Sequence, residues 1–126
     1  MRVKRALMCF LTVCLWIPFS AAAGEVVIEG VDIEPSNAGG FNFSVTLRHD
    51  DTGWSHFADK WLILAGDGTT VLGERVLFHP HVNEQPVTRG LRSVLIPDGI
   101  TEVVVRAHAR DHGWSKNEVR ATIPGR

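Results

Sequence analysis

The sequence predicts an all-β fold: a seven-stranded antiparallel β-sandwich that follows a cleaved signal peptide. Three observations support this prediction. Helical periodicity is absent after residue 23, short β-branched runs recur along the chain, and turn-forming residues separate these runs at regular intervals. Seven short strands in about 100 residues are typical of two antiparallel sheets packed face to face.

The first 23 residues have the features of a secretory signal peptide. Residues 1–5 are basic, residues 6–19 are apolar, and residues 21–23 supply alanines for a cleavage site. No second apolar run near 18 residues follows, so we expect no membrane span. Lipoprotein signals carry a small residue before the lipid-bearing cysteine, whereas Val13 precedes Cys14. We therefore expect cleavage after Ala23, no lipid anchor, and a periplasmic or secreted protein.

Removal of residues 1–23 changes the composition of the chain. The 126-residue precursor becomes a domain of 103 residues with 10 Lys and Arg, 14 Asp and Glu, and a net charge of −4. Both cysteines and both methionines leave with the signal, whereas all six histidines remain. The acidic charge argues against nucleic acid and anionic membranes as partners. The lack of sulfur excludes disulfides and soft-ligand copper sites.

The first four expected strands follow the signal in order. The first, residues 25–34, ends at the Pro- and Gly-containing segment 35–40. The second, residues 41–49, alternates apolar and polar side chains, which is the pattern of a half-buried strand. The third, residues 60–65, carries Trp61, and a Gly-Asp-Gly turn leads into the fourth, residues 70–78.

Three further strands complete the expected sandwich. They are residues 87–96, residues 100–109 after a Pro-Asp-Gly turn, and residues 118–123. Because antiparallel strands reverse direction each time, successive loops alternate between the two ends of a sandwich. The turns 35–40, 66–69 and 97–99 are expected at one end. The loops 50–59, 79–86 and 110–117 are expected at the other.

Two features of these strands resemble known families. Trp61 in the third strand, and the segment 96–107 that leads from a turn into the sixth strand, resemble immunoglobulin and fibronectin type III domains. The resemblance implies the sandwich architecture, although the corner tyrosine and the disulfide of those families are absent. Residues 79–89 also resemble a segment of small exported bacterial proteins of unassigned function, which implies no activity.

All six histidines fall at one expected end of the sandwich. Neutral imidazoles bind Zn²⁺ and Cu²⁺ when three or four of them converge. His79 and His81 flank Pro80 and share one face of an extended chain, so they form the best local pair. Two main interpretations remain open: a Zn or Cu(II) site, or histidines whose hydrogen bonds tie the loops together; an acid–base role is a third. The candidate metal ligands are His49, His56, His79, His81, His108 and His112.

The same end carries two copies of a short pattern. Residues 51–55 read DTGWS and residues 111–115 read DHGWS. Their tryptophans, Trp54 and Trp114, are expected either to cap the core from two similar turns or to form two aromatic walls of one site. Asp51 and Glu84 are further candidates for ligand or partner contact. Asp50 and Asp51 could act as an acid–base pair or bind Ca²⁺, but adjacent residues of a strand point in opposite directions, so we expect the two carboxylates to cap the loop that follows them.

The sequence contains no convincing catalytic constellation. Ser55 and Ser115 neighbour histidines in the chain, but adjacency alone does not make a catalytic triad. The predicted function is therefore an exported, non-enzymatic binding domain that acts through the histidine-rich loops, with a metal ion as ligand. The alternative is a protein–protein interaction module that uses the same loops with Trp54 and Trp114.

Overall fold

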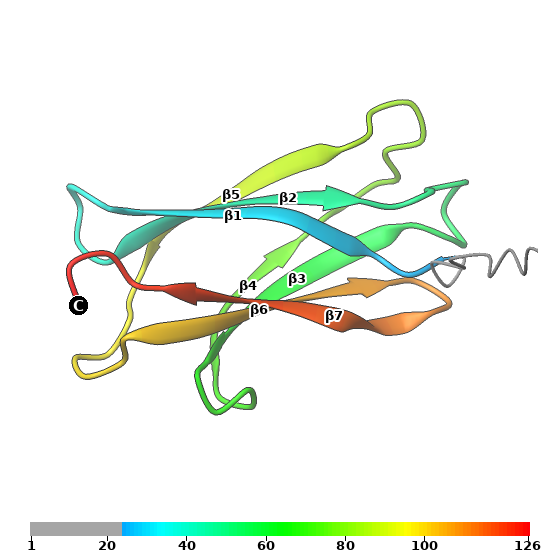
Figure 1. Cartoon of the computed structure of the whole chain (residues 1–126). Coiled ribbons are helices and arrows are strands. Elements are labelled where there is room, and N and C mark those ends of the chain that lie inside the picture. Colours follow the sequence, from blue (N-terminus) through cyan, green and yellow to red (C-terminus); the bar gives the residue numbers. More distant parts are fainter. Residues whose placement is uncertain (1–23) are drawn as a thin grey trace, which may run out of the picture.

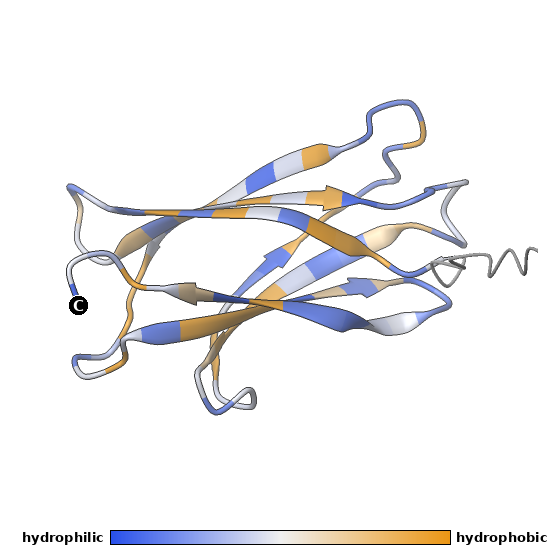
Figure 2. Cartoon of the chain, in the orientation of Figure 1, coloured by the Kyte–Doolittle hydropathy of each residue, from blue (hydrophilic) through white to orange (hydrophobic). Residues whose placement is uncertain are grey.

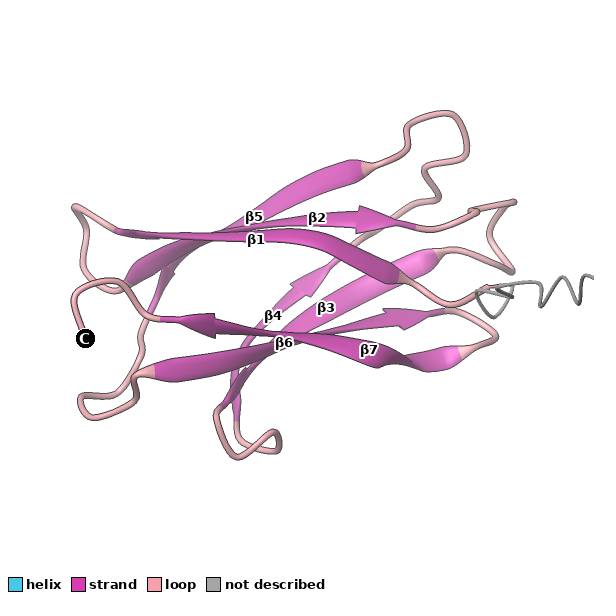
Figure 3. Cartoon of the chain, viewed as in Figure 1, coloured by secondary structure: helices cyan, strands magenta, loops and turns pink. Residues whose placement is uncertain are grey.

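The computed structural model describes residues 24–126, which form two packed antiparallel sheets connected by loops (Figure 1, Figure 3). The prediction of a seven-stranded all-β sandwich is confirmed, and residues 24–126 contain no helix. The signal-peptide prediction concerns residues 1–23, which lie outside the described part of the chain. The strands are β1 (Val27–Pro35), β2 (Phe41–Arg48), β3 (Ala58–Ala65), β4 (Val71–Val76), β5 (Val87–Val94), β6 (Glu102–Ala109) and β7 (Gly113–Thr122).

The strands divide into a three-stranded and a four-stranded sheet. The strand orders are β1-β2-β5 and β4-β3-β6-β7, and every neighbouring pair is antiparallel. The connections β2–β3, β4–β5 and β5–β6 therefore cross between the sheets. These crossings bring residues that are distant in sequence to the same end of the sandwich (Figure 1). No helix that could cross a membrane occurs within residues 24–126.

The core lies between the two sheets and is built from alternate residues of each strand (Figure 2). Phe43, Val45 and Leu47 of β2 are fully buried, as are Trp61 and Ile63 of β3. Burying a side chain of this size stabilises the folded state by about 1.5–3 kcal/mol. The period of two in the sequence of β2 therefore corresponds to a period of two in burial, as the alternation predicts.

The seventh strand begins at Gly113, so the expected start at residue 118 is wrong. β7 extends over Trp114 and three polar residues because β6 supplies its hydrogen-bonding partner, with Ala109 opposite Gly113 and His108 opposite Trp114. β7 is an edge strand, and its outer face can carry polar side chains. The polar residues at its start therefore do not show the alternation by which a strand is recognised in a sequence. The expected loop 110–117 shrinks to a turn at residues 110–112, and Trp114 lies in a strand.

Candidate functional site

The candidate site is the end of the sandwich that carries the histidines. We call it the histidine-rich end; it comprises residues 24–26, the loops 49–57, 77–86 and 110–112, and the adjoining His108. The strand order confirms that all six histidines lie here, since each one occupies or borders a β2–β3, β4–β5 or β6–β7 connection. Figure 1 shows these connections beside the start of β1.

Asp51 is the residue that holds these loops together. Its Oδ1 accepts hydrogen bonds from Nδ1 of His49 at 2.5 Å and from the backbone N–H of Ala58 at 2.9 Å. Its Oδ2 accepts the backbone N–H of His81 at 2.8 Å. The carboxylate therefore joins the end of β2, the start of β3 and the β4–β5 loop. The bond to Ala58 confirms the expected capping for Asp51, whereas within residues 24–126 the side chain of Asp50 makes no hydrogen bond and is exposed.

His49 is oriented by acceptors at both of its ring nitrogens. Nδ1 faces Asp51, and Nε2 lies 2.9 Å from the carbonyl oxygen of Gly24. The carboxylate of Asp51 and the carbonyl of Gly24 are both acceptors, and together they fix the orientation of the imidazole ring. Because both ring nitrogens are directed at protein oxygens, His49 offers no free nitrogen to a metal ion.

Gln85 provides a second connection between the loops, and the sequence analysis missed it. Its Oε1 accepts the backbone N–H of His49, and its Nε2 donates to the carbonyl oxygen of His81, both at 3.0 Å. No spacing rule singles out a lone glutamine, although its place in the segment 79–89 is a weak signal. Together with Asp51, Gln85 fixes the backbone around His49 and His81.

His81 is buried and lies beside a permanent cation. Its Nε2 is 3.1 Å from Nη2 of Arg89, and its ring centroid is 4.4 Å from that of His79. Burial lowers the pKa of His81 below its ordinary value of 6.5, and the charges of His79 and Arg89 lower it further. A neutral His81 accepts the hydrogen bond from Arg89, which uses its Nε2 lone pair. Glu84 lies at the surface, 3.6 Å from Arg89.

His108 and Trp114 lie together on the outer face of the four-stranded sheet. Nδ1 of His108 lies 2.5 Å from Asp59, and its ring packs edge-on against Trp114 at 4.8 Å. Lys60 and Arg106 place their charges 5.3 and 5.9 Å from the same indole. Such cation–π contacts hold the indole against the sheet.

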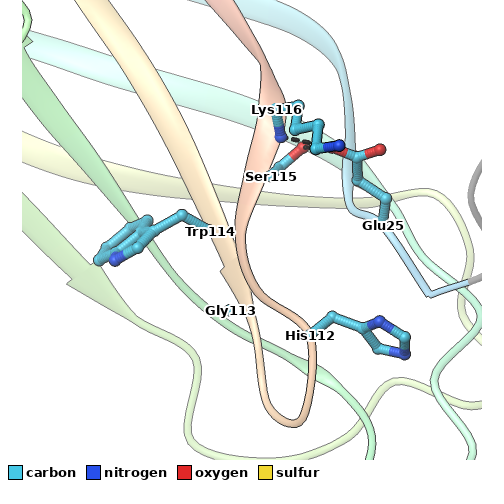
Figure 4. Close-up of a pocket in the computed structure, with 6 residues that line it drawn as sticks. All are labelled: Glu25, His112, Gly113, Trp114, Ser115 and Lys116. Atoms are coloured by element: carbon cyan, nitrogen blue, oxygen red, sulfur yellow. Dashed lines mark hydrogen bonds between the residues drawn. The ribbon is translucent and has the colours of Figure 1, made fainter.

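The two tryptophans of the repeated pattern lie in different surroundings. Trp54 is 64% exposed and packs edge-on against the buried Phe57, whereas Trp114 is 40% exposed and packs against His108. Trp114 points to the opposite side of β7 from His112 and Glu25 (Figure 4). The interpretation of two core-capping turns fits Trp54, which contacts the buried Phe57. It does not fit Trp114, because the second copy of the pattern begins a strand and its indole packs against His108.

His56 and His112 form an edge-to-face pair at the surface. Their ring centroids are 5.1 Å apart, and His56 also lies 4.8 Å from the ring of His49. Every hydrogen bond to a histidine ring within residues 24–126 belongs to one of the other four histidines. His56 and His112 therefore have the imidazole nitrogens most available to a ligand.

A pocket of about 160 Å³ adjoins His112. Glu25 lines it and is held in place, because its carboxylate accepts the backbone N–H of Lys116. Figure 4 shows Glu25 and His112 on the same side of β7. The pocket is lined by Glu25, His112, Gly113, Trp114, Ser115 and Lys116.

The titratable side chains do not by themselves form a metal centre. Within residues 24–126, no three His, Asp or Glu side chains are arranged so that they could hold one ion. The six histidines instead form smaller groups: His49 with His56 and His112, His79 with His81, and His108 with Asp59. Any metal ion bound here therefore needs a ligand from outside this set.

The fold and the loops define a seven-stranded β-sandwich with one histidine-rich end. A protein of Halomicrobium mukohataei named "Putative lipoprotein" is 46% identical to this chain over 88 residues. The match covers 67% of this chain and 41% of the relative, so the chain spans about two fifths of the relative's length. No family model matches the chain. No solved structure matches it either.

Proposed function

We propose that this protein is an exported binding domain that takes a divalent transition-metal ion, Zn²⁺ or Cu²⁺, at its histidine-rich end. One observation carries the proposal: His56 and His112 are in contact at the surface, and no hydrogen bond within residues 24–126 engages their ring nitrogens. Neutral imidazoles of this kind are ordinary ligands for both ions. His49, His81 and His108 instead serve the structure, because at least one nitrogen of each ring contacts another protein group.

Export is supported by the signal-like segment 1–23 and by the relative's name. The name describes the relative as a lipoprotein, and we do not extend a lipid anchor to this chain. Cleavage after Ala23 remains our proposal, because Val13 occupies the position before Cys14. The strand orders β1-β2-β5 and β4-β3-β6-β7 support an immunoglobulin- or fibronectin III-like sandwich.

The surroundings of the His49–Asp51 pair and of Ser115 support binding rather than catalysis. The His49–Asp51 pair has the composition of a general-base dyad, but both side chains are 1% exposed and Nε2 of His49 faces Gly24. Ser115 donates its hydroxyl hydrogen to the carbonyl oxygen of Val26 at 2.7 Å, so no histidine activates it. A general base must lie within hydrogen-bonding distance of the proton that it removes. Because His49 is buried, a bound substrate would not come into contact with its ring nitrogens.

A calorimetric titration of the tag-free protein with Zn²⁺ and Cu²⁺ tests the proposal. We expect saturable binding and a higher melting temperature, because an ion at 100 times its Kd stabilises the folded state by about 2.7 kcal/mol. The double variant His56→Gln/His112→Gln should lose the binding. The matched control His79→Gln, an exposed histidine outside this pair, should retain it. The absence of any binding or melting shift with either ion would overturn the metal proposal.

A protein partner is the second candidate ligand, and a different observation favours it. Phe78 is 74% exposed and Trp54 is 64% exposed, and both belong to loops of the histidine-rich end. Exposed aromatic side chains are enriched where proteins bind one another. Val82, in the same loop as Phe78, adds a third exposed apolar side chain.

A further inference from the structure

The backbone of Gly24 lies against two histidines of the proposed site. Its carbonyl oxygen lies 2.9 Å from Nε2 of His49. A Cβ atom built on Gly24 would fall 2.1 Å from Nε2 of His112. Because a backbone nitrogen and a Cβ on the same Cα are about 2.5 Å apart, the nitrogen of Gly24 lies within roughly 5 Å of that imidazole nitrogen.

The residues that follow Gly24 are anchored one by one. The carboxylate of Glu25 accepts the backbone N–H of Lys116 at the start of β7. The carbonyl oxygen of Val26 accepts hydrogen bonds from Ser115 at 2.7 Å and from Asn117 at 2.9 Å. The start of the folded domain is therefore held against β7, and a ligand atom on Gly24 would need little additional ordering.

Cleavage after Ala23 would change the chemistry of the Gly24 nitrogen. In the precursor this nitrogen belongs to a peptide bond, and its lone pair is delocalised into the amide. In the cleaved protein it is an α-amine, which in its neutral form has a lone pair for a metal ion. The α-amine lies beside His112, so it can supply the additional metal ligand that the His, Asp and Glu side chains do not provide.

We propose that the α-amino group of Gly24, released by signal cleavage, completes a three-nitrogen Cu(II) site with the imidazoles of His112 and His56. The inference rests on the proposed metal-binding function and specifies its ligands. Cu(II) is favoured over Zn²⁺ because nitrogen donors bind Cu²⁺ more tightly and mature residues offer no thiolate. His49 acts as a positioning residue, since its hydrogen bond orients the Gly24 carbonyl. The site then forms only after cleavage, so Cu(II) loading follows export.

The test compares two proteins produced from the full chain by export. One is the natural precursor, whose product is checked by mass to begin at Gly24. The other carries Gly-Ser inserted between Ala23 and Gly24, which turns the Gly24 nitrogen into an amide and moves the amine by two residues. Cu(II) affinity is measured by calorimetry, the number of nitrogen ligands by electron paramagnetic resonance, and the fold by circular dichroism.

We expect three nitrogen ligands in the natural product, and an affinity about tenfold or more weaker in the inserted protein. His112→Gln should weaken binding similarly, and Gly24→Ala should weaken it by displacing the ring of His112. If the natural and inserted proteins bind Cu(II) equally tightly, and only the histidine substitutions weaken binding, the α-amine is not a ligand. The proposed metal-binding function would then still stand. A natural product that begins at another residue would also overturn the α-amine of Gly24 as a ligand. No binding of Cu(II) or Zn²⁺ by the natural product would overturn both proposals.

Discussion

The carboxylate of Asp51 pairs with the imidazole of His49 while both side chains are 1% exposed. The same carboxylate also accepts two backbone N–H groups, from Ala58 and His81. A single aspartate thus satisfies donors from the β2–β3 loop, from β3 and from the β4–β5 loop. The geometry of the histidine-rich end depends on this one carboxylate.

Replacement of Asp51 by asparagine should therefore destabilise the whole domain. Asparagine has only one acceptor oxygen, so at least one of the buried donors that Asp51 satisfies loses its partner, which costs about 1–3 kcal/mol. Urea unfolding of Asp51→Asn should show a decrease of this size in the free energy of unfolding. The matched control is Asp50→Asn, at the exposed neighbouring position, which should change it by less than about 0.5 kcal/mol. Equal effects of the two substitutions would contradict the role given to Asp51.

His81 should make the domain less stable in mild acid. Its pKa is lowered in the folded state, chiefly by burial, so the unfolded chain takes up the proton first as the pH falls. The stability that it contributes is fully present above pH 6.5 and is lost as the pH falls through the lowered pKa. Imidazole NMR should show His81 titrating below 6.5, and unfolding experiments from pH 7 to 5 should show a flatter profile for His81→Gln. A His81 titration at or above 6.5 would refute this prediction.

Asp67 should remain ionised to unusually low pH in the β3–β4 turn. Hydrogen bonds lower its pKa to about 2, the largest effect coming from the Thr70 hydroxyl and the next from the backbone N–H of Thr70. Because the pKa is lowered, the contribution to stability is present above about pH 4 and is lost as the pH falls through about 2.

The variant Thr70→Val tests this account of Asp67. It removes the hydroxyl and keeps the backbone N–H, so the pKa of Asp67 should rise toward 3.8. Carboxyl carbon NMR measures the shift directly. Thr69→Val is the control, since the Thr69 hydroxyl has the smallest effect on this pKa and its removal should alter it least. A larger rise in Thr69→Val than in Thr70→Val would show that the hydroxyl of Thr70 is not the main cause.

The sequence was most informative where burial imposes a period on it. The alternation that ends at Leu47 correctly placed His49 on the inner face, where it is buried. The placement of His108 on the other face of β6 also follows from alternation, and His108 is half-buried there beside Asp59. Both inferences need only the period of two in an extended strand.

The hydrogen-bonding partners within the histidine-rich end could not be predicted in the same way. Gln85 and Asp51 act through backbone atoms of distant loops, and a backbone N–H has no signature in the sequence. The polar composition of residues 114–117 predicts a loop that includes Trp114. Pairing with β6 makes these residues part of a strand instead. Contacts between loops depend on how the sheets pack, which local composition does not encode.

The exposed aromatic side chains at the histidine-rich end should mark any protein partner. A photoreactive residue at position 54 or 78 should form a discrete crosslinked product in cells that produce the protein, because both side chains are largely exposed in loops of the histidine-rich end. The matched control is position 95, where Leu95 is 76% exposed in the β5–β6 connection at the opposite end. Trp54→Ser and Phe78→Ser should each change the free energy of unfolding by about 0.5 kcal/mol or less. Crosslinking that is absent from positions 54 and 78, or equally strong at position 95, would exclude this partner surface.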